Sequence, residues 1–276
     1  MKTMIQKAVW LFLIAVAFTS CEKDDDCDPT DEESPCYVGP PSGAKGDMLL
    51  LTEQKINGKT VATYEYDDQN RMIRNYPYDA DGVNNITISH TYNANGLLTI
   101  TNFVNQDGEN FLREEYTYGG GDKPVSMVQT QPNLSDGTPI DWQFTYSNNR
   151  LASETAIPRD EDALVITMTY TYDNEGNLVS WEQMADGEWL TTLEYGDYDD
   201  RAFIAKYGNP YFWKAGNSNA NNPRTEKTTS QAPSANKDVV ITYTYNNAGY
   251  PTKAAVYNRG SDVVVETREY NYKKAN

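Results

Sequence analysis

The sequence predicts an all-β protein: an antiparallel up-and-down meander of about 15–16 strands, curled into an open or closed barrel-like sheet. First, a Tyr-x-Tyr motif recurs along the chain with a period near 26 residues. Second, the residues around each motif alternate between apolar and polar with the strand period of two. Third, Asn, Asp and Gly follow most motifs, and these residues tolerate the positive φ of tight hairpin turns.

Residues 1–20 have the features of a signal peptide and are excluded from the fold. Lys2 and Lys7 accompany an apolar stretch, Ala8 to Phe18, which is too short to span a bilayer as a mature helix. Two small residues then lead into Cys21. This pattern resembles a lipoprotein signal, which implies that Cys21 is the first mature residue and carries palmitate or another acyl chain. An ordinary cleaved signal peptide is the alternative.

Residues 21–46 are expected to form an acidic, proline-rich tether, because they lack the alternating pattern of a strand. The stretch CEKDDD, Cys21 to Asp26, resembles the Lys/Asp-rich signal that directs Bacteroidetes-type lipoproteins to the outer face of the outer membrane. Cys27 and Cys36 are an even pair, which can form a disulfide in an oxidising compartment. No His lies near them, which disfavours a zinc site.

Residues 47–276 form the predicted repeat domain of eight units. The best copy of the unit, ITMTYTYDNEGNLVSWEQM, runs from Ile166 to Met184 and reads as two strands joined by a turn. The second tyrosine of each motif anchors its unit, and successive anchors lie 26–28 residues apart, except for 47 between Tyr198 and Tyr245. These anchor tyrosines are Tyr66, Tyr92, Tyr118, Tyr146, Tyr172, Tyr198, Tyr245 and Tyr272. A single sheet cannot leave such an aromatic face bare, so we expect it to be internal, with something filling the middle.

Two resemblances support this fold. Tyr172, Asp173, Gly176 and Leu178 match the Y-D-x-x-G-x-L core of the YD repeats of rearrangement-hotspot shells and teneurins. From residue 48 to the end, the chain more closely resembles a family of Bacteroidetes-type lipoproteins of unknown function with a porin-like β fold. The resemblance implies a fold and an outer-membrane location, but no activity.

Charge and polarity limit the partners. The net charge of −17 repels phosphate backbones and anionic lipid, so we expect no nucleic acid and no membrane contact beyond the lipid anchor. The face opposite the tyrosines is polar, as in Thr87, Ser89 and Thr91, and hydrocarbon would penalise it. We therefore expect a soluble domain that does not span the membrane.

The long gap before Tyr245 predicts an insert, placed at residues 208–236. Aromatic rings beside amide groups suit sugar recognition. The candidate ligand-binding residues are Tyr207, Tyr211, Phe212, Trp213, Asn217 and Asn219. The alternative, which we favour, is that the aromatics plug the curled sheet. Three adjacent aromatics can rarely all face water, and Pro210 suits a turn into the interior.

Signals for chemistry are weak. The sequence contains no phosphate loop, metal signature or nucleophile triad, so no catalytic residue, metal or cofactor is predicted. His90 falls in a strand and is interpreted as a core residue. Asp197, Asp199 and Asp200 are interpreted as an acidic turn, with calcium binding or catalysis as the alternative.

The sequence thus predicts a surface lipoprotein that acts as a non-catalytic binding or structural module. Its candidate partners are a glycan or another envelope protein. A glycan-binding accessory protein that uses the aromatic and Asn-rich insert is the first alternative. A carbohydrate-active hydrolase ranks last, since a carboxylate pair is not identifiable from the sequence.

Overall fold

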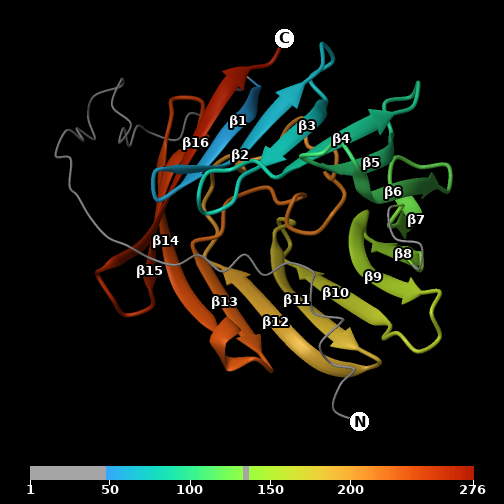
Figure 1. The fold of residues 1–276 in the computed structure, drawn as a ribbon. Coiled ribbons are helices and arrows are strands. Elements are labelled where there is room, and N and C mark those ends of the chain that lie inside the picture. Colours follow the sequence, from blue (N-terminus) through green and yellow to red (C-terminus); the bar gives the residue numbers. More distant parts are fainter. Residues whose placement is uncertain (1–47, 133–136) are drawn as a thin grey trace.

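The computed structural model describes residues 48–132 and 137–276, which form sixteen antiparallel strands (Figure 1). The strands are β1 Leu49–Ile56, β2 Lys59–Tyr66, β3 Met72–Pro77, β4 Ile86–Tyr92, β5 Leu98–Asn105, β6 Asn110–Tyr118, β7 Pro124–Thr130, β8 Ile140–Ser147, β9 Arg150–Pro158, β10 Ile166–Tyr172, β11 Leu178–Ala185, β12 Glu188–Gly196, β13 Thr225–Ser230, β14 Lys237–Tyr245, β15 Pro251–Asn258 and β16 Val264–Lys274.

The sheet is a closed barrel. Each strand pairs with its neighbours in sequence, and β1 pairs with β16 in a register that runs from Leu49 opposite Lys274 to Ile56 opposite Arg268. This confirms the predicted meander and its strand number, and it selects the closed barrel over the open one. Within the described ranges, the one helical element is the short 3-10 turn Pro233–Ala235, and no helix is long and apolar enough to cross a membrane. The predicted signal, tether, lipidation site Cys21 and Cys27–Cys36 pair lie outside the described residues.

The residue that follows an anchor tyrosine closes its hairpin. In the β10–β11 turn, Asp173 Oδ1 accepts the backbone N–H groups of Glu175 at 3.0 Å and Asn177 at 2.8 Å. Asn93 and Asn246 make the same pair of bonds in their own turns. Such a side chain substitutes for a backbone turn, which explains why Asp and Asn recur at this position.

In most units the anchor hydroxyl ties the hairpin to the one before it. It donates to the backbone carbonyl that begins the second strand of the preceding unit, 20 to 22 residues earlier in the clearest cases. These bonds are Tyr92 to Met72 at 2.6 Å, Tyr118 to Leu98 at 2.7 Å, Tyr146 to Pro124 at 2.8 Å and Tyr172 to Leu151 at 2.9 Å. The period of the sequence is therefore also the period of a cross-strand bond.

The tyrosine face is internal, as the alternation predicts. Tyr116, Phe144 and Ile241 are buried inside the barrel, whereas Thr171 and Thr242 are exposed on the opposite face. Two apolar clusters pack inside the barrel. One is Leu51, Val239, Ile241, Ala254, Val256 and Tyr270, and the other is Leu98, Tyr116, Met127, Phe144, Leu151 and Trp213.

Candidate ligand-binding cavity inside the barrel

The insert is an expanded hairpin turn. In an ordinary unit, the N–H after the anchor tyrosine bonds four residues ahead, as from Asp173 to Asn177. The equivalent bond of Asp199 reaches Asn222, so this turn is 19 residues longer. The predicted insert, 208–236, therefore lies too far towards the C-terminus. The added residues fall between Asp199 and Asn222, and residues 225–230 form β13. The sequence did not reveal the shift because β13 has no Tyr-x-Tyr motif.

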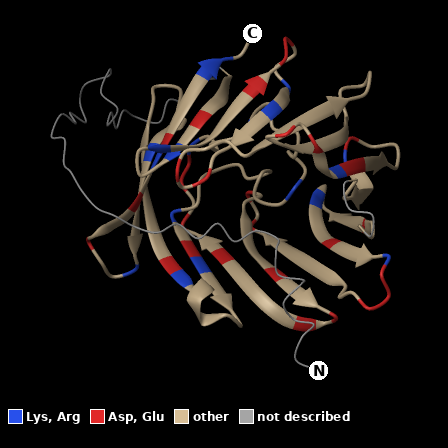
Figure 2. Cartoon of the chain, in the orientation of Figure 1, with Lys and Arg blue, Asp and Glu red and all other residues tan. Residues whose placement is uncertain are grey.

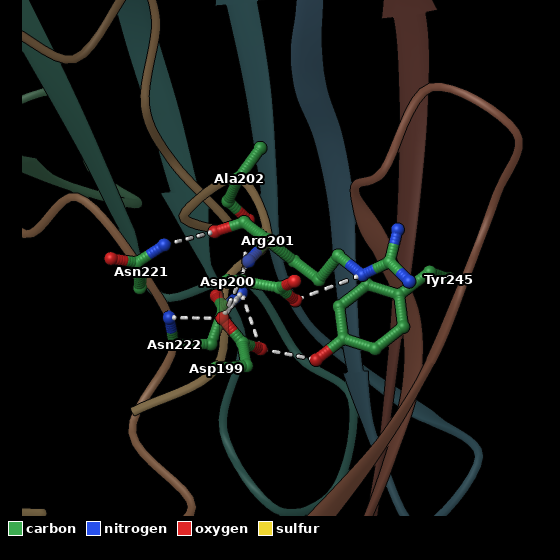
Figure 3. A network of polar contacts seen from close by, with 7 residues as sticks. All are labelled: Asp199, Asp200, Arg201, Ala202, Asn221, Asn222 and Tyr245. Atoms are coloured by element: carbon green, nitrogen blue, oxygen red, sulfur yellow. Dashed lines mark hydrogen bonds and ion pairs between the residues drawn. The ribbon is translucent and has the colours of Figure 1, made fainter. Parts of the chain in front are cut away.

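Asp199 fastens the base of the expanded turn (Figure 3). Its carboxylate is buried and accepts backbone N–H groups from Arg201 and Asn222, each at 3.0 Å. Asn222 also donates from its side chain at 3.2 Å, and the Tyr245 hydroxyl completes the set. Asp200 is exposed and pairs with Arg201. These contacts confirm the turn interpretation, and among the described residues no group of three or more His, Cys, Asp or Glu could hold a metal.

From this base the chain enters the barrel, where it appears as the orange coil enclosed by the strands in Figure 1. The Gly208 carbonyl accepts the Met72 N–H at 3.0 Å, which docks the insert on the start of β3. Asn219 Oδ1 accepts the Leu178 N–H at 2.9 Å, which docks it on the start of β11. The insert thus bridges opposite parts of the wall.

Trp213 is the largest fully buried side chain of the insert, with 1% of its surface exposed. Its ring centroid lies 4.8 Å from that of Phe144 and 6.1 Å from that of Tyr116. This confirms that Trp213 is a plug residue. Phe212, its neighbour, is 43% exposed. The consecutive aromatics therefore do not all enter the core.

A buried polar network holds the insert to strands β4–β6. The Tyr211 hydroxyl lies 3.1 Å from Thr101 Oγ1, which also contacts His90 Nδ1 at 3.2 Å. The Tyr116 hydroxyl donates to Glu114. Burial raises the pKa of the Glu114 carboxyl and lowers that of His90 to about 4, so the imidazole is neutral at pH 7. The core interpretation of His90 is confirmed: it is 6% exposed.

On its other side the insert leaves a cavity of about 460 Å³. The insert supplies one wall, and strands β1–β3, β12–β14 and β16 supply much of the other. Its volume falls within the range of small-molecule sites, about 300–1,000 Å³. Its lining of aromatic and polar side chains is also typical of such sites.

Four of the six candidate residues line this cavity: Tyr207, Tyr211, Asn217 and Asn219. Trp213 and Phe212 do not line it. The wall adds polar residues that sequence reasoning missed: Gln54, Asn75, Glu226 and Arg268. A signal existed for Arg268, because it shares the parity of Tyr270 and Tyr272 and therefore puts a charge on the inward face.

The two charged lining residues are each paired. Glu226 accepts from Lys237 at 3.2 Å, and Arg268 donates to Glu266 at 2.5 Å. Burial opposes the charge on Arg268, but Tyr270 and Glu266 raise its pKa above the ordinary value. The cavity therefore presents both signs of charge, each compensated by a neighbour.

Comparison with solved structures identifies the fold. A porin-like protein from Bacteroides vulgatus ATCC 8482 aligns over 82% of this chain and 99% of its own, with a TM-score of 0.51 and 12% identity. A porin-like protein from Bacteroides uniformis ATCC 8492 aligns over 81% and 98%, with a TM-score of 0.49 and 14% identity. No protein-family model matches the chain, and the search of curated proteins found no match. The similarity extends to the barrel and not to a function.

Proposed function

We propose that this protein is a non-catalytic binding module of the cell surface, with its ligand site in the cavity between the insert and the barrel wall. The observation that carries the proposal is the cavity itself. A plug that served only to fill the barrel would be expected to leave little space. Here the expanded turn fills one side of the interior and leaves about 460 Å³ on the other.

The number of carboxylates that line the cavity favours a binding role over hydrolysis. Glycosidases use two carboxyl groups on either side of the scissile bond. Among the lining residues that the structure describes, Glu226 is the single carboxylate. Glu114 and Glu154 are buried outside the lining, and each accepts a tyrosine hydroxyl.

The chain enters and leaves the barrel at the same end. β1 starts beside the end of β16, and the Asn276 N–H donates to Asn70 Oδ1 in the β2–β3 turn at 3.0 Å. The chain therefore enters the barrel at the end that carries the insert.

The outer wall suits an aqueous setting. Figure 2 shows acidic and basic residues distributed along the strands and loops around the barrel. Outward side chains form exposed ion pairs such as Arg74–Glu65 at 3.2 Å and Lys227–Glu194 at 3.0 Å. Hydrocarbon would strongly penalise such a wall.

A cavity-filling variant tests the proposal. Ala205 lines the cavity, so Ala205→Trp should occupy it. Purified full-length protein and this variant would be screened by thermal shift against a panel of oligosaccharides, short peptides, nucleosides and amino acids. We expect at least one class to stabilise the wild type and Phe212→Ala, but not Ala205→Trp. If no class stabilises the wild type, the binding role is wrong and a structural docking role takes its place.

Anchoring is tested separately. Cys21→Ser should abolish labelling by a fatty-acid analogue and release the protein from the membrane fraction. Retained labelling would contradict the lipoprotein assignment.

A further inference from the structure

We infer that the cavity takes an uncharged saccharide, and that Glu226 and Arg268 set this preference over acidic sugars. The inference rests on the proposed function and names the class of ligand for the same site. Its evidence is the set of uncommitted polar groups, the balance of charge and the aromatic lining.

The cavity contains polar groups that the fold does not use. The Tyr207 hydroxyl and the Asn217 amide line it and make no hydrogen bond within the described part of the chain. Asn219 is already committed, because its Oδ1 accepts the Leu178 N–H and its side chain also hydrogen-bonds the Tyr198 hydroxyl. Donors and acceptors are thus interspersed along the insert wall. A hydroxyl, which both donates and accepts, matches such a mixture.

The opposite wall adds one negative and one positive side chain, Glu226 and Arg268, whose charges balance. Glu226 engages Lys237 through Oε1, which leaves its second oxygen as an acceptor. Arg268 engages Glu266 through Nε and also hydrogen-bonds Tyr270, and its guanidinium carries further N–H groups. An anionic ligand would meet the Glu226 carboxylate, and it would approach a chain of net charge −17. A cationic ligand would meet Arg268.

Aromatic rings complete the site. Tyr195, Tyr207 and Tyr243 line the cavity together with Phe203. The Tyr243 hydroxyl is committed to the Pro223 carbonyl at 3.0 Å, which holds its ring in place. Fixed aromatic rings provide an apolar surface for the C–H groups of a sugar at little entropic cost. Charged metabolites that lack such C–H groups would make no comparable contact with these rings.

Titration calorimetry on the purified full chain tests the inference. The probes are neutral gluco-, manno- and xylo-oligosaccharides and an oligogalacturonide of the same length. We expect a neutral probe to bind at least about tenfold more tightly than the oligogalacturonide. Asn217→Ala should weaken neutral binding about tenfold, whereas Phe212→Ala, an exposed neighbour outside the cavity, should leave it unchanged. Glu226→Gln should reduce the discrimination, because it removes the carboxylate that lines the cavity and leaves Lys237 without its partner.

The outcomes separate the two proposals. Preferential binding of the oligogalacturonide, or saturation of the cavity by a peptide or nucleoside and not by a neutral sugar, overturns the saccharide inference and leaves the binding role intact. Neutral binding that survives both Asn217→Ala and Ala205→Trp places the site elsewhere and overturns both. Unchanged discrimination in a folded Glu226→Gln variant contradicts the assigned role of the charged pair.

Discussion

At the residue scale, the hydroxyl of the anchor tyrosine explains why tyrosine, and not phenylalanine, recurs at this position. Burial of the ring would be served equally by phenylalanine. The hydroxyl also satisfies a backbone carbonyl in the preceding unit, as from Tyr146 to Pro124. There are two exceptions among the anchors: the Tyr245 hydroxyl donates to the Asp199 carboxylate, and the buried Tyr272 hydroxyl has no partner among the described residues.

Tyr272 supplies a matched pair of substitutions with Tyr146. Tyr146→Phe should lower the free energy of unfolding by about 1 kcal/mol, because it leaves the Pro124 carbonyl without its donor. Tyr272→Phe removes an unsatisfied hydroxyl and should be neutral or stabilising. Urea unfolding at pH 7 measures both. Equal losses in the two variants would show that the ladder of hydroxyl bonds does not contribute to stability.

His90 should make the barrel sensitive to mild acid. Burial lowers its pKa from 6.5 to about 4, so the unfolded chain takes up a proton in a range where the folded chain does not. The associated stability is present above pH 6.5 and is lost as the pH falls towards 4, to a total of about 3 kcal/mol. The carboxylates with lowered pKa, such as Asp173, add to the loss at the lower end of the range.

Replacement by a side chain that does not titrate isolates the contribution of His90. His90→Gln can keep bonds to Thr101 and Asn75 while it removes the proton uptake. Between pH 6.5 and 4 its unfolding free energy should fall less steeply than that of the wild type. Parallel pH profiles would mean that the imidazole takes up its proton over the same pH range in the folded barrel as in the unfolded chain.

At the element scale, the insert is one turn of the repeat that has grown without breaking its base. Asp199 keeps the role of Asp173, and Asn222 takes the place of Asn177. The 19 additional residues alter neither the strand order nor the closure of the barrel. Long insertions in turns cost little, because loop-closure entropy rises slowly with length. Their contacts inside the barrel then decide whether they add stability.

Close docking of the insert predicts a different result for two glycines. Gly208 and Gly82 have nearly the same positive φ, 74° and 77°. A Cβ at Gly208 would lie 2.6 Å from a Tyr66 ring carbon and 2.8 Å from the Asn70 carbonyl oxygen, whereas a Cβ at Gly82 meets nothing within 4 Å. Gly82→Ala should cost about 1 kcal/mol of stability for backbone strain alone. Gly208→Ala should cost about 1–3 kcal/mol more in chemical denaturation, and equal costs would mean that the insert is loosely seated.

At the scale of the whole molecule, the sequence specified the strands but not the contents of the barrel. Period-two alternation and the turn after each tyrosine are local, so the strand number and the inward face could be predicted. Closure could not, because pairing of β1 with β16 joins residues more than 200 positions apart. The residues of the cavity wall were hard to predict for the same reason. Asn217 stood out within the insert, whereas Arg268 joins the site only through the register of distant strands.

The account depends centrally on the insert being part of the barrel interior, and one comparison of chemical unfolding tests this. Trp213→Ala removes a ring that is 1% exposed and packed on Phe144, so it should lower the free energy of unfolding by about 3–5 kcal/mol. Phe212→Ala, one residue away and 43% exposed, should change it by less than about 1 kcal/mol. A Trp213→Ala protein as stable as the wild type would contradict the account, because the insert would then be a surface loop and the cavity would have no inner wall.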